Sequence, residues 1–361
     1  MRVVLDDSML DDQRRLFEAD TQGLLRQAAL AGAQVRSAAH SAAEVGLDVL
    51  GGQRPRALVL LSRPGVGAAA CDSLAALLGS SCPVPVVRTE VVPSWIGPLD
   101  VVFAHGPDGG DRELAESLEV AGRRGAGVVL ATPDEGPVAA AVAGRARTVS
   151  PRIPVAAGLD FAHVFTVGAC LLEALGLLRI DTEELADALD ERAAATHPAH
   201  ESSRNPAKNL ALRLAERMPL LWGVDELATA VAGHGAFVLG CYGGVPCDVG
   251  EYAQAVNRYA LYDRAASAGS EAELFADPGE GTAGLRVLLL TTRAGERAGF
   301  LEQRATAALP GADVLSPPET AREDATLRAG LLAVGFDMAA VYLGLASGLL
   351  DGHQRPMLTT S

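Results

Sequence analysis

The chain has 361 residues, 49% of them hydrophobic, and a formal net charge of −15. The acidic balance argues against a nucleic-acid partner, because neutralising phosphates requires clustered basic side chains. No apolar stretch reaches the roughly 18 to 20 uncharged residues that a membrane span needs, since the longest candidate, 329–350, contains Asp337. The acidic start, MRVVLDDSMLDD, lacks the features of a signal peptide. We therefore expect a cytoplasmic protein that associates with neither nucleic acid nor membrane.

The cysteines and histidines give no sign of a bound metal or cofactor. No CxxC spacing occurs, and no set of His, Cys and carboxylate side chains has a convincing metal-ligand spacing. The three-glycine dinucleotide fingerprint is also missing, so the sequence predicts no nicotinamide site and no other cofactor. In the cytoplasm the cysteines are expected to be reduced, buried small side chains. They are Cys71, Cys82, Cys170, Cys241 and Cys247.

Residues 1–56 have a helical pattern, and from residue 57 short apolar runs alternate with alanine-rich helical stretches. Runs that are apolar throughout and alternate with helices predict a parallel sheet with helices on both faces. The expected strands are Ala57–Leu61, Val84–Val87, Asp100–Ala104 and Gly127–Ala131, with helices over 67–78, 111–124 and 135–145. A long apolar helix over 161–178 and a charged one over 182–195 complete this half.

A polar stretch, 197–204, links this half to a second one that opens with NPAKNLALRLAERMPLLWG over 205–223. Asn205 can cap a helix and Pro206 suits its first position, while Leu220–Trp222 forms a short buried strand after Pro219. The further strands are expected over 285–291 and 312–315, with an extended piece at 245–247. The further helices are expected to open at Asp225 and to cover 252–266, 293–309 and 322–350. We predict an α/β protein with an N-terminal helical segment (1–56) and two domains, 57–196 and 205–361.

Three motifs appear in an order that resembles one known family. They are NPAK followed by a helix and MPLLWG (205–223), PSWIGP (93–98) before a strand, and Val245-Pro246. This order resembles the bifunctional phosphoglucose/phosphomannose isomerases, which are built from two sugar-isomerase (SIS) domains. The resemblance implies two tandem SIS-type, flavodoxin-like, three-layer αβα units with parallel sheets. It also implies a homodimer that binds a phosphorylated sugar, and aldose–ketose isomerisation of glucose-6-phosphate or mannose-6-phosphate to fructose-6-phosphate.

The resemblance also points to two loops as the ligand-binding region. The family's phosphate loop, which reads like Ser-Tyr-Ser-Gly-Asn-Thr, matches 105–110 here, where no hydroxyl side chain occurs. The glycines could still offer backbone N–H groups to an anion, although Asp108 and Asp111 would repel it unless they are paired. The earlier loop, 63–67, keeps two glycines and adds an arginine that could contact an anion. The candidate ligand-binding residues are Arg63, Gly65, Gly67, His105, Gly106, Gly109 and Gly110.

The family's catalytic positions are mostly replaced in this sequence. Its arginine falls near Ala162, its glutamate becomes Cys241, its histidine becomes Gln254, and its terminal lysine is missing. Glu251 is retained before Gln254, and His234 is a second candidate for acid–base chemistry; His105 and His163 are further candidates. The sequence therefore leaves three hypotheses open. The chain is a diverged isomerase, an inactive phosphosugar-binding or regulatory scaffold, or a purely structural dimer.

Overall fold

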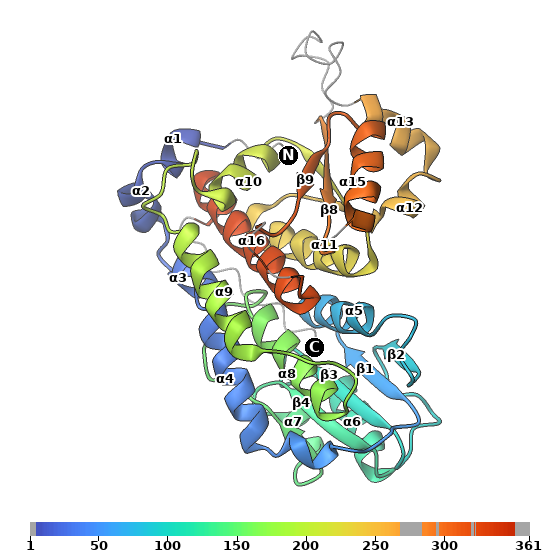
Figure 1. Ribbon diagram of the computed structural model, residues 1–361. Coiled ribbons are helices and arrows are strands. Elements are labelled where there is room, and N and C mark those ends of the chain that lie inside the picture. The colour runs from blue at the N-terminus through green and yellow to red at the C-terminus, as the bar shows by residue number, and fades with distance from the viewer. Residues whose placement is uncertain (1–4, 268–283, 294–295, 319–320, 322, 351–361) are drawn as a thin grey trace. The chain divides into compact units, whose positions relative to one another are not determined.

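The computed structural model describes residues 5–267, 284–293, 296–318, 321 and 323–350 (Figure 1). The chain divides into two compact units, each with its own parallel sheet. Residues 30–187 form the first, which we call the five-strand unit. The described residues up to Ala29, together with those from Ala188 onward, form the second, which we call the four-strand unit.

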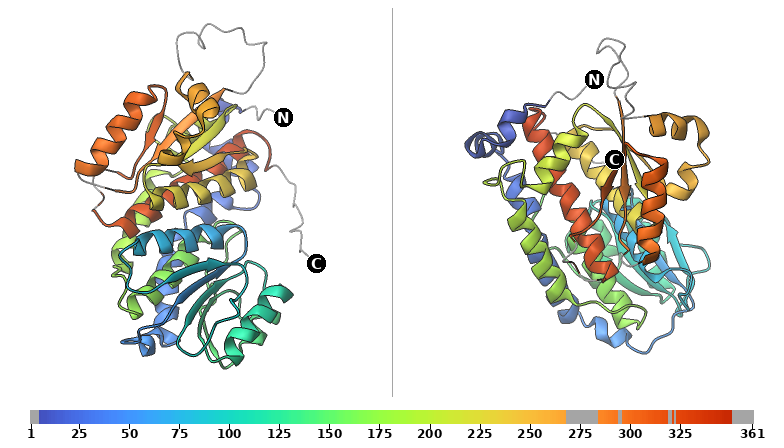
Figure 2. Two further views of the ribbon diagram at one scale, coloured as in Figure 1. Left: turned by 90° about the vertical axis from the view of Figure 1, so that its right-hand side faces the viewer. Right: turned by 45° about the horizontal axis from the view of Figure 1, so that its top comes forward.

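The sheet of the five-strand unit has the strand order β2-β1-β3-β4-β5, with every neighbouring pair parallel. Its central strands are buried along their whole length, which explains their uninterrupted apolar sequences. Figure 2 shows this sheet with helices on both sides. The strands are β1 (Leu58–Ser62), β2 (Val86–Thr89), β3 (Val101–His105), β4 (Gly127–Ala131) and β5 (Ala146–Thr148).

Helices cover both faces of this sheet. One face packs on α6 (Arg112–Arg123) and α7 (Pro137–Ala141) through a cluster that includes Val102, Leu118 and Val138. On the other face α5 (Val66–Leu78) and α8 (Phe161–Ala174) cross closely, because a Cβ at Gly168 would lie 2.2 Å from Leu74 Cδ1. The remaining helices of this unit are α4 (Ala31–Glu44) and η1 (Leu47–Leu50); α9 (Thr182–Ala195) runs from this unit into the other.

The sheet of the four-strand unit has the order β7-β6-β8-β9 and is also parallel. Trp222 is its largest fully buried side chain. The indole Nε1 donates to Asp248 Oδ2 at 3.0 Å, and the ring stacks on Tyr262 with centroids 6.2 Å apart. The strands are β6 (Met218–Gly223), β7 (Asp248–Glu251), β8 (Leu285–Leu290) and β9 (Asp313–Leu315).

The terminal helix α16 (Ala325–Ala346) is the centre of the four-strand unit. Its residues 326–346 are all buried, and it packs against α3 (Leu24–Ala28), α10 (Pro206–Leu214) and α11 (Glu226–Val238) (Figure 1). By length and composition it is the one helix among the described residues that could cross a membrane, yet it is wholly enclosed by protein. A helix that is apolar on every side is typical of a buried core helix.

The other described helices of this unit are short. They are α1 (Asp7–Leu10), α2 (Gln13–Ala19), α3 (Leu24–Ala28), α10 (Pro206–Leu214), α11 (Glu226–Val238), η2 (Leu239–Gly243), α12 (Tyr252–Ala255), α13 (Tyr259–Ser267) and α15 (Glu296–Ala308). Buried alanines of α12, α13 and α15 pack with Leu220, Trp222 and Leu289 on one face of the sheet.

The NPAK motif has a structural role in this unit. Asn205 caps α10, because its Oδ1 accepts from the backbone N–H groups of Ala207 at 3.0 Å and Lys208 at 3.1 Å. The ammonium of Lys208, the chain's single lysine, donates to the carbonyls of Pro198 and His200 at 2.8 and 2.7 Å. Burial lowers the pKa of this lysine. The motif therefore holds the polar link 197–204 against α10.

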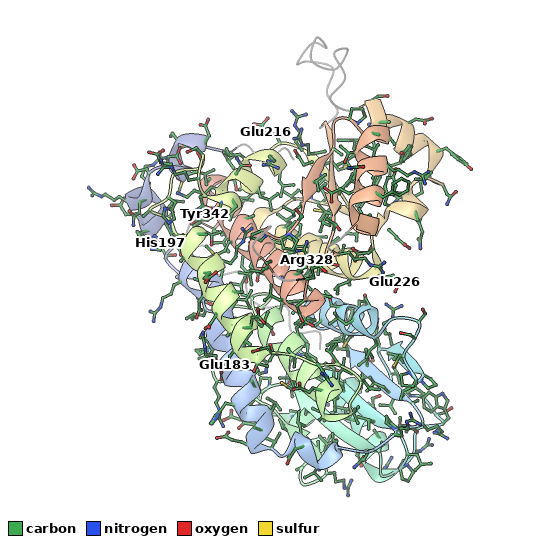
Figure 3. The ribbon with its side chains drawn as sticks, in the orientation of Figure 1. Glu183, His197, Glu216, Glu226, Arg328 and Tyr342 are labelled. Atoms are coloured by element: carbon green, nitrogen blue, oxygen red, sulfur yellow. The ribbon has the colours of Figure 1, made fainter. Side chains whose placement is uncertain are left out.

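Tyr342 of α16 completes this arrangement. Its ring centroid lies 5.5 Å from the Lys208 ammonium, and its hydroxyl donates to the carbonyl of Thr196 at 2.6 Å. Figure 3 labels Tyr342 and His197, which belong to the two segments joined in this way.

Some details of the sequence prediction were wrong. Strand β5 was not predicted, and the extended piece placed at 245–247 is followed by a strand, β7, at Asp248–Glu251. The helix predicted over 252–266 is two helices, α12 and α13, separated by a turn. Among the free cysteines only Cys71 is buried, and Cys241 is exposed. Position 241 lies on η2, the turn that ends α11, and therefore outside the packed face of that helix.

Candidate functional site

The two candidate loops meet at the carboxyl edge of the five-strand sheet. Strands β1 and β3 are neighbours, with Ser62 opposite His105, so the loops that follow them begin side by side. Gly65 has φ 116°, a backbone conformation that favours glycine. Gly67 is required by close packing, since a Cβ there would lie 2.4 Å from His105 Cδ2. Crevices outside the carboxyl ends of parallel strands are where open α/β sheets bind ligands.

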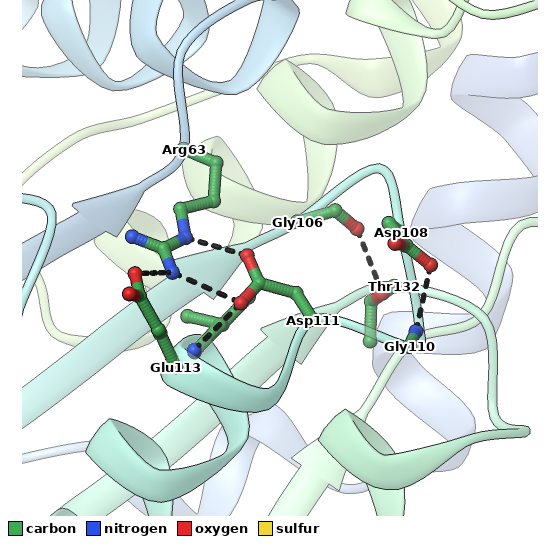
Figure 4. Close-up of polar contacts among 8 residues, drawn as sticks. Arg63, Gly106, Asp108, Gly110, Asp111, Glu113 and Thr132 are labelled. Atoms are coloured by element: carbon green, nitrogen blue, oxygen red, sulfur yellow. Dashed lines mark hydrogen bonds and ion pairs between the residues drawn. The ribbon is translucent and has the colours of Figure 1, made fainter. Parts of the chain in front are cut away.

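Arg63 lies at this edge of the sheet, and its partner is a side chain of the protein itself (Figure 4). Its Nε and Nη2 donate to the two carboxylate oxygens of Asp111 at 2.6 and 2.9 Å, and Nη2 also donates to Glu113 at 2.9 Å. Asp111 also caps α6, because Oδ1 accepts from the backbone N–H of Leu114 at 2.9 Å. The carboxylate of Asp111 therefore occupies the helix N-terminus, where a ligand anion would be expected.

Electrostatics and burial strengthen this pairing. The Arg63 and Asp111 side chains are only 15% and 17% exposed. The hydrogen bond from Arg63 is the main cause that holds the pKa of Asp111 below its usual range, and the same bond raises the pKa of Arg63. A bidentate arginine–carboxylate contact of this kind is among the stronger polar interactions in proteins.

The polar groups of the 105–110 loop are also used within the protein. The backbone N–H of Gly110 donates to Asp108 Oδ1 at 2.7 Å, and the carbonyl of Gly106 accepts from Thr132 Oγ1 at 2.9 Å (Figure 4). A Cβ at Gly109 would lie 2.7 Å from the Glu135 carbonyl oxygen, so this glycine is required for packing. The loop is therefore ordered by its own contacts. Thr132 follows β4, and sequence reasoning missed it because it lies outside both candidate loops.

Beside the loop lies a buried polar cluster that we call the His–Asp–His cluster: His105, Asp160 and His163. His105 Nδ1 donates to the carbonyl of Ala131 at 2.6 Å, which leaves Nε2 facing Asp160 Oδ2 at 3.9 Å. His105 Nε2, Asp160 Oδ1 and His163 Nε2 are buried and have no hydrogen-bond partner among the described residues. Burial is the main cause that lowers the pKa of His163 to about 4. Sequence reasoning missed Asp160, the N-cap residue of α8.

This cluster does not form a metal site. Among the described residues, no group of three or more His, Cys, Asp or Glu side chains is arranged to hold a metal ion. Three unsatisfied polar atoms in one buried place still cost free energy unless water or a ligand reaches them.

The carboxyl edge of the four-strand sheet has a different set of polar groups. Asp225 caps α11 through the backbone N–H of Ala228 at 2.9 Å, and it also accepts from the Thr292 hydroxyl at 2.8 Å and the Thr292 N–H at 3.2 Å. Arg328, near the start of α16, donates from Nε to the Thr292 carbonyl at 2.6 Å. The Thr291 hydroxyl is buried without a partner among the described residues. We call this group the Arg328 edge.

Sequence reasoning missed the Arg328 edge. The signal that could have found it is the position of β8 in the sheet, because β8 pairs with β6 in the same way as β3 pairs with β1. The residues after β8, Thr291-Thr292-Arg293, therefore correspond to the 105–110 loop of the first half, and they supply the hydroxyl and basic side chains that the first loop lacks.

The two acid–base candidates have different surroundings. Glu251 ends β7, in register with Gly223 of β6, so it lies at the carboxyl edge of the four-strand sheet. His234 is fully buried within α11, and its Nε2 lies 2.7 Å from Asp337 Oδ1 on α16. Cys241 is exposed on η2, and partial burial of its sulfur raises the pKa of the thiol.

Neither a protein-family model nor a curated protein sequence matches the chain. Solved structures do match it. The C-terminal domain of glucosamine-fructose-6-phosphate aminotransferase from Francisella tularensis has a TM-score of 0.63 at 8% identity, over 92% of this chain and 98% of that chain. Tagatose-6-phosphate ketose/aldose isomerase from Escherichia coli has a TM-score of 0.61 at 12% identity, over 88% of this chain and 91% of that chain. A hypothetical protein from Thermus thermophilus has a TM-score of 0.64 at 14% identity, over 95% of this chain and 90% of that chain.

At these identities the likeness shows the fold. Two parallel sheets flanked by helices, of five and four strands, match SIS-type, flavodoxin-like units in tandem. The fold class expected from the sequence is confirmed. The narrower resemblance, to phosphoglucose/phosphomannose isomerases, stays a prediction.

Proposed function

We propose that this protein binds a phosphorylated sugar and does not isomerise it. The binding half of the proposal is supported by the fold, which is similar to that of proteins named for phosphosugar chemistry across most of both chains. It is also supported by Arg328, whose guanidinium lies beside the carboxyl end of β8, because open α/β sheets bind ligands at the carboxyl ends of their strands.

The observation that carries the second half is the contact between Arg63 and Asp111. An isomerase of this kind would need a free cation and a free helix N-terminus at the 105–110 loop. Here the carboxylate of Asp111 binds both the Arg63 guanidinium and the N-terminus of α6. A thiol at position 241 with a raised pKa stays protonated near neutral pH, so it offers no base for carbon–hydrogen chemistry. Holding the phosphate, moving the proton and stabilising the enediolate would all need other residues.

The second candidate function is isomerisation of glucose-6-phosphate or mannose-6-phosphate to fructose-6-phosphate. One observation favours it: Glu251 stands at the carboxyl edge of the four-strand sheet, beside the end of β6. A carboxylate in such a place is a reasonable base for proton transfer between two sugar carbons. Glu251 and His234 remain its proposed catalytic residues. The glycines of the first unit, with Arg63 and His105, remain its proposed ligand contacts.

The setting of this function is also part of the proposal. We propose a homodimer that binds phosphosugars of mannose metabolism in the cytoplasm, as the family resemblance implies. Because α16 is buried along its length, the dimer would use other surfaces, such as the exposed end of α9 at Ala194 and Ala195.

Calorimetry and an exchange assay test the proposal together. Wild-type protein is titrated with glucose-, mannose- and fructose-6-phosphate, and the same preparation is incubated with each sugar in D₂O while NMR follows deuterium entry at C1 and C2. We expect saturable binding of at least one sugar and no deuterium above the background without protein. Deuterium entry would favour the isomerase, with Glu251→Gln as the first variant to assay. No binding at millimolar concentration would contradict the proposal.

A further inference from the structure

Arg328 is a buried cation, and some of its hydrogen-bond donors have no partner in the described part of the chain. The residue is 7% exposed and projects from the first turns of α16 (Figure 3). Its Nε donates to the carbonyl of Thr292 at 2.6 Å, and Nη2 reaches the carbonyl of Arg293 at 3.4 Å. A guanidinium carries five N–H groups in a fixed fork. Three of them therefore have no partner among the described residues.

No described carboxylate pairs with Arg328. Burial lowers the pKa of Arg328, and the nearby carboxylates of Glu323, Asp225 and Glu302 oppose that shift only in part. None of the three forms an ion pair with Arg328 in the part of the chain that the structure describes. Asp225 is instead engaged by Thr292 and by the N-terminus of α11. Buried charges are normally paired, because removing an isolated ion from water is costly. The described residues therefore provide no counter-anion for Arg328.

The position of Arg328 suits a ligand. Its two acceptors belong to the residues that follow β8, so the guanidinium lies at the carboxyl edge of the four-strand sheet. β8 and β6 are the central strands of that sheet, and the carboxyl ends of such strands are the usual ligand position in open α/β sheets. The buried hydroxyl of Thr291, 2% exposed and without a described partner, lies at the same strand end.

We propose that the phosphate group of the sugar ligand binds at the Arg328 edge, and not at the glycine loop of the five-strand unit. This inference rests on the proposed phosphosugar binding and names the site that carries it. The free N–H groups of Arg328 donate to phosphate oxygens, and the Thr291 hydroxyl is the second donor. Arginine is suited to this role because its planar fork matches the geometry of a phosphate.

The test compares three variants with the wild-type protein. Arg328→Met removes the guanidinium, and Arg328→Lys keeps a positive charge. Arg286→Met removes an arginine from β8, at the end of that strand opposite to the Arg328 edge. Arg286 is the matched control because it is paired with Asp313 at 2.6 Å and lies at the start of β8. Circular dichroism and thermal unfolding check that each variant is folded. Calorimetry then measures the affinity of each for fructose-6-phosphate and for inorganic phosphate.

We expect Arg328→Met to weaken both affinities by about 10- to 100-fold, the usual effect of losing a charged hydrogen bond to an anion. Arg328→Lys should lose less, and Arg286→Met should bind as the wild-type protein does. If fructose-6-phosphate binds wild-type and Arg328→Met equally well, the site is wrong although the proposed function stands. If only inorganic phosphate binds, and Arg328→Met abolishes that binding, the anion site stands and the phosphosugar proposal fails. If neither binds to the wild-type protein, both are wrong.

Discussion

The carboxyl edges of the two sheets each hold an arginine, and the two arginines differ in what they contact. Arg63 is bound by the carboxylates of Asp111 and Glu113, whereas Arg328 contacts only main-chain carbonyls among the described residues. Both helices that begin at these edges, α6 and α11, are capped by an aspartate. An arginine at a ligand-binding position is therefore no sufficient sign of an anion site. Whether such an arginine can bind a ligand anion depends on whether a carboxylate of the protein already pairs with it.

Stability measurements provide the largest expected contrast between the two edges. Arg63→Met leaves Asp111 largely buried without its cation, and we expect it to lower the free energy of unfolding by about 3 kcal/mol. Arg328→Met leaves only neutral carbonyls unpaired and also removes a buried charge that no described carboxylate pairs, so we expect a loss of at most about 1 to 2 kcal/mol. Urea-induced unfolding at neutral pH measures both. Equal losses, or a larger loss for Arg328→Met, would mean that Arg328 is already neutralised within the protein.

The His–Asp–His cluster lies at the carboxyl edge of the five-strand sheet. The burial of His163 predicts that the stability of the protein depends on pH. His163 has a pKa of about 4 in the folded protein, against 6.5 for the ordinary side chain. Between these values the unfolded chain takes up a proton that the folded chain does not, so stability falls as the pH falls. The loss across this window should be about 3 kcal/mol. Unfolding followed by urea at several pH values, with wild-type protein and His163→Asn, checks this.

His163→Asn should remove most of that slope, since asparagine does not titrate. The interpretation fails if the variant keeps the slope of the wild-type protein between pH 6.5 and 4.

Packing at the carboxyl edge of the five-strand sheet can be tested at Gly67. Gly67→Ala places a Cβ 2.4 Å from the present position of His105 Cδ2, so the imidazole must move. We expect the overpacking to cost about 1 to 3 kcal/mol in thermal or urea unfolding. Gly52→Ala is not a suitable control because Gly52 has a positive φ; Gly233→Ala is, since nothing lies within 4 Å of a Cβ there. A Gly67→Ala protein as stable as Gly233→Ala would show that the two loops are not packed together.

The smallest effect is expected at Glu251. Its side chain is partly exposed, and its one described hydrogen-bond contact is with Gln254 at 3.5 Å. Glu251→Gln should change the affinity for fructose-6-phosphate by less than about 2-fold, and the unfolding free energy by less than about 0.5 kcal/mol, as is usual for such a surface change. A much larger fall in affinity would place Glu251 against the ligand and favour the isomerase.

Much of the fold follows from local sequence patterns. The strand Gly127–Ala131 and the helix Thr182–Ala195 have the bounds that were predicted, and Asn205 and Asp225 cap helices as expected. These features depend on residues close together in the chain, where hydrophobic period and capping chemistry are strong signals. Strand β5 has only three residues, all of them half-buried, so it carried no such signal.

The polar contacts of the site could not be predicted in the same way. The sequence indicated that Asp111 would repel an anion unless it was paired, but its partner, Arg63, is 48 residues away. Arg328 and Thr292 are 36 residues apart, and no local pattern joins them. Such pairs are brought together by the crossovers of a parallel sheet, so only the tertiary structure identifies them.

One NMR titration tests the difference between the two arginines directly. The protein is labelled with ¹⁵N-arginine, the Nε–Hε signals of Arg63 and Arg328 are assigned with the Arg63→Lys and Arg328→Lys variants, and inorganic phosphate is added at constant ionic strength and pH. We predict that the Arg328 signal shifts saturably while the Arg63 signal stays in place. A saturable shift of the Arg63 signal with no change in the Arg328 signal would contradict the account. Phosphate would then displace Asp111 and bind at the carboxyl edge of the five-strand sheet.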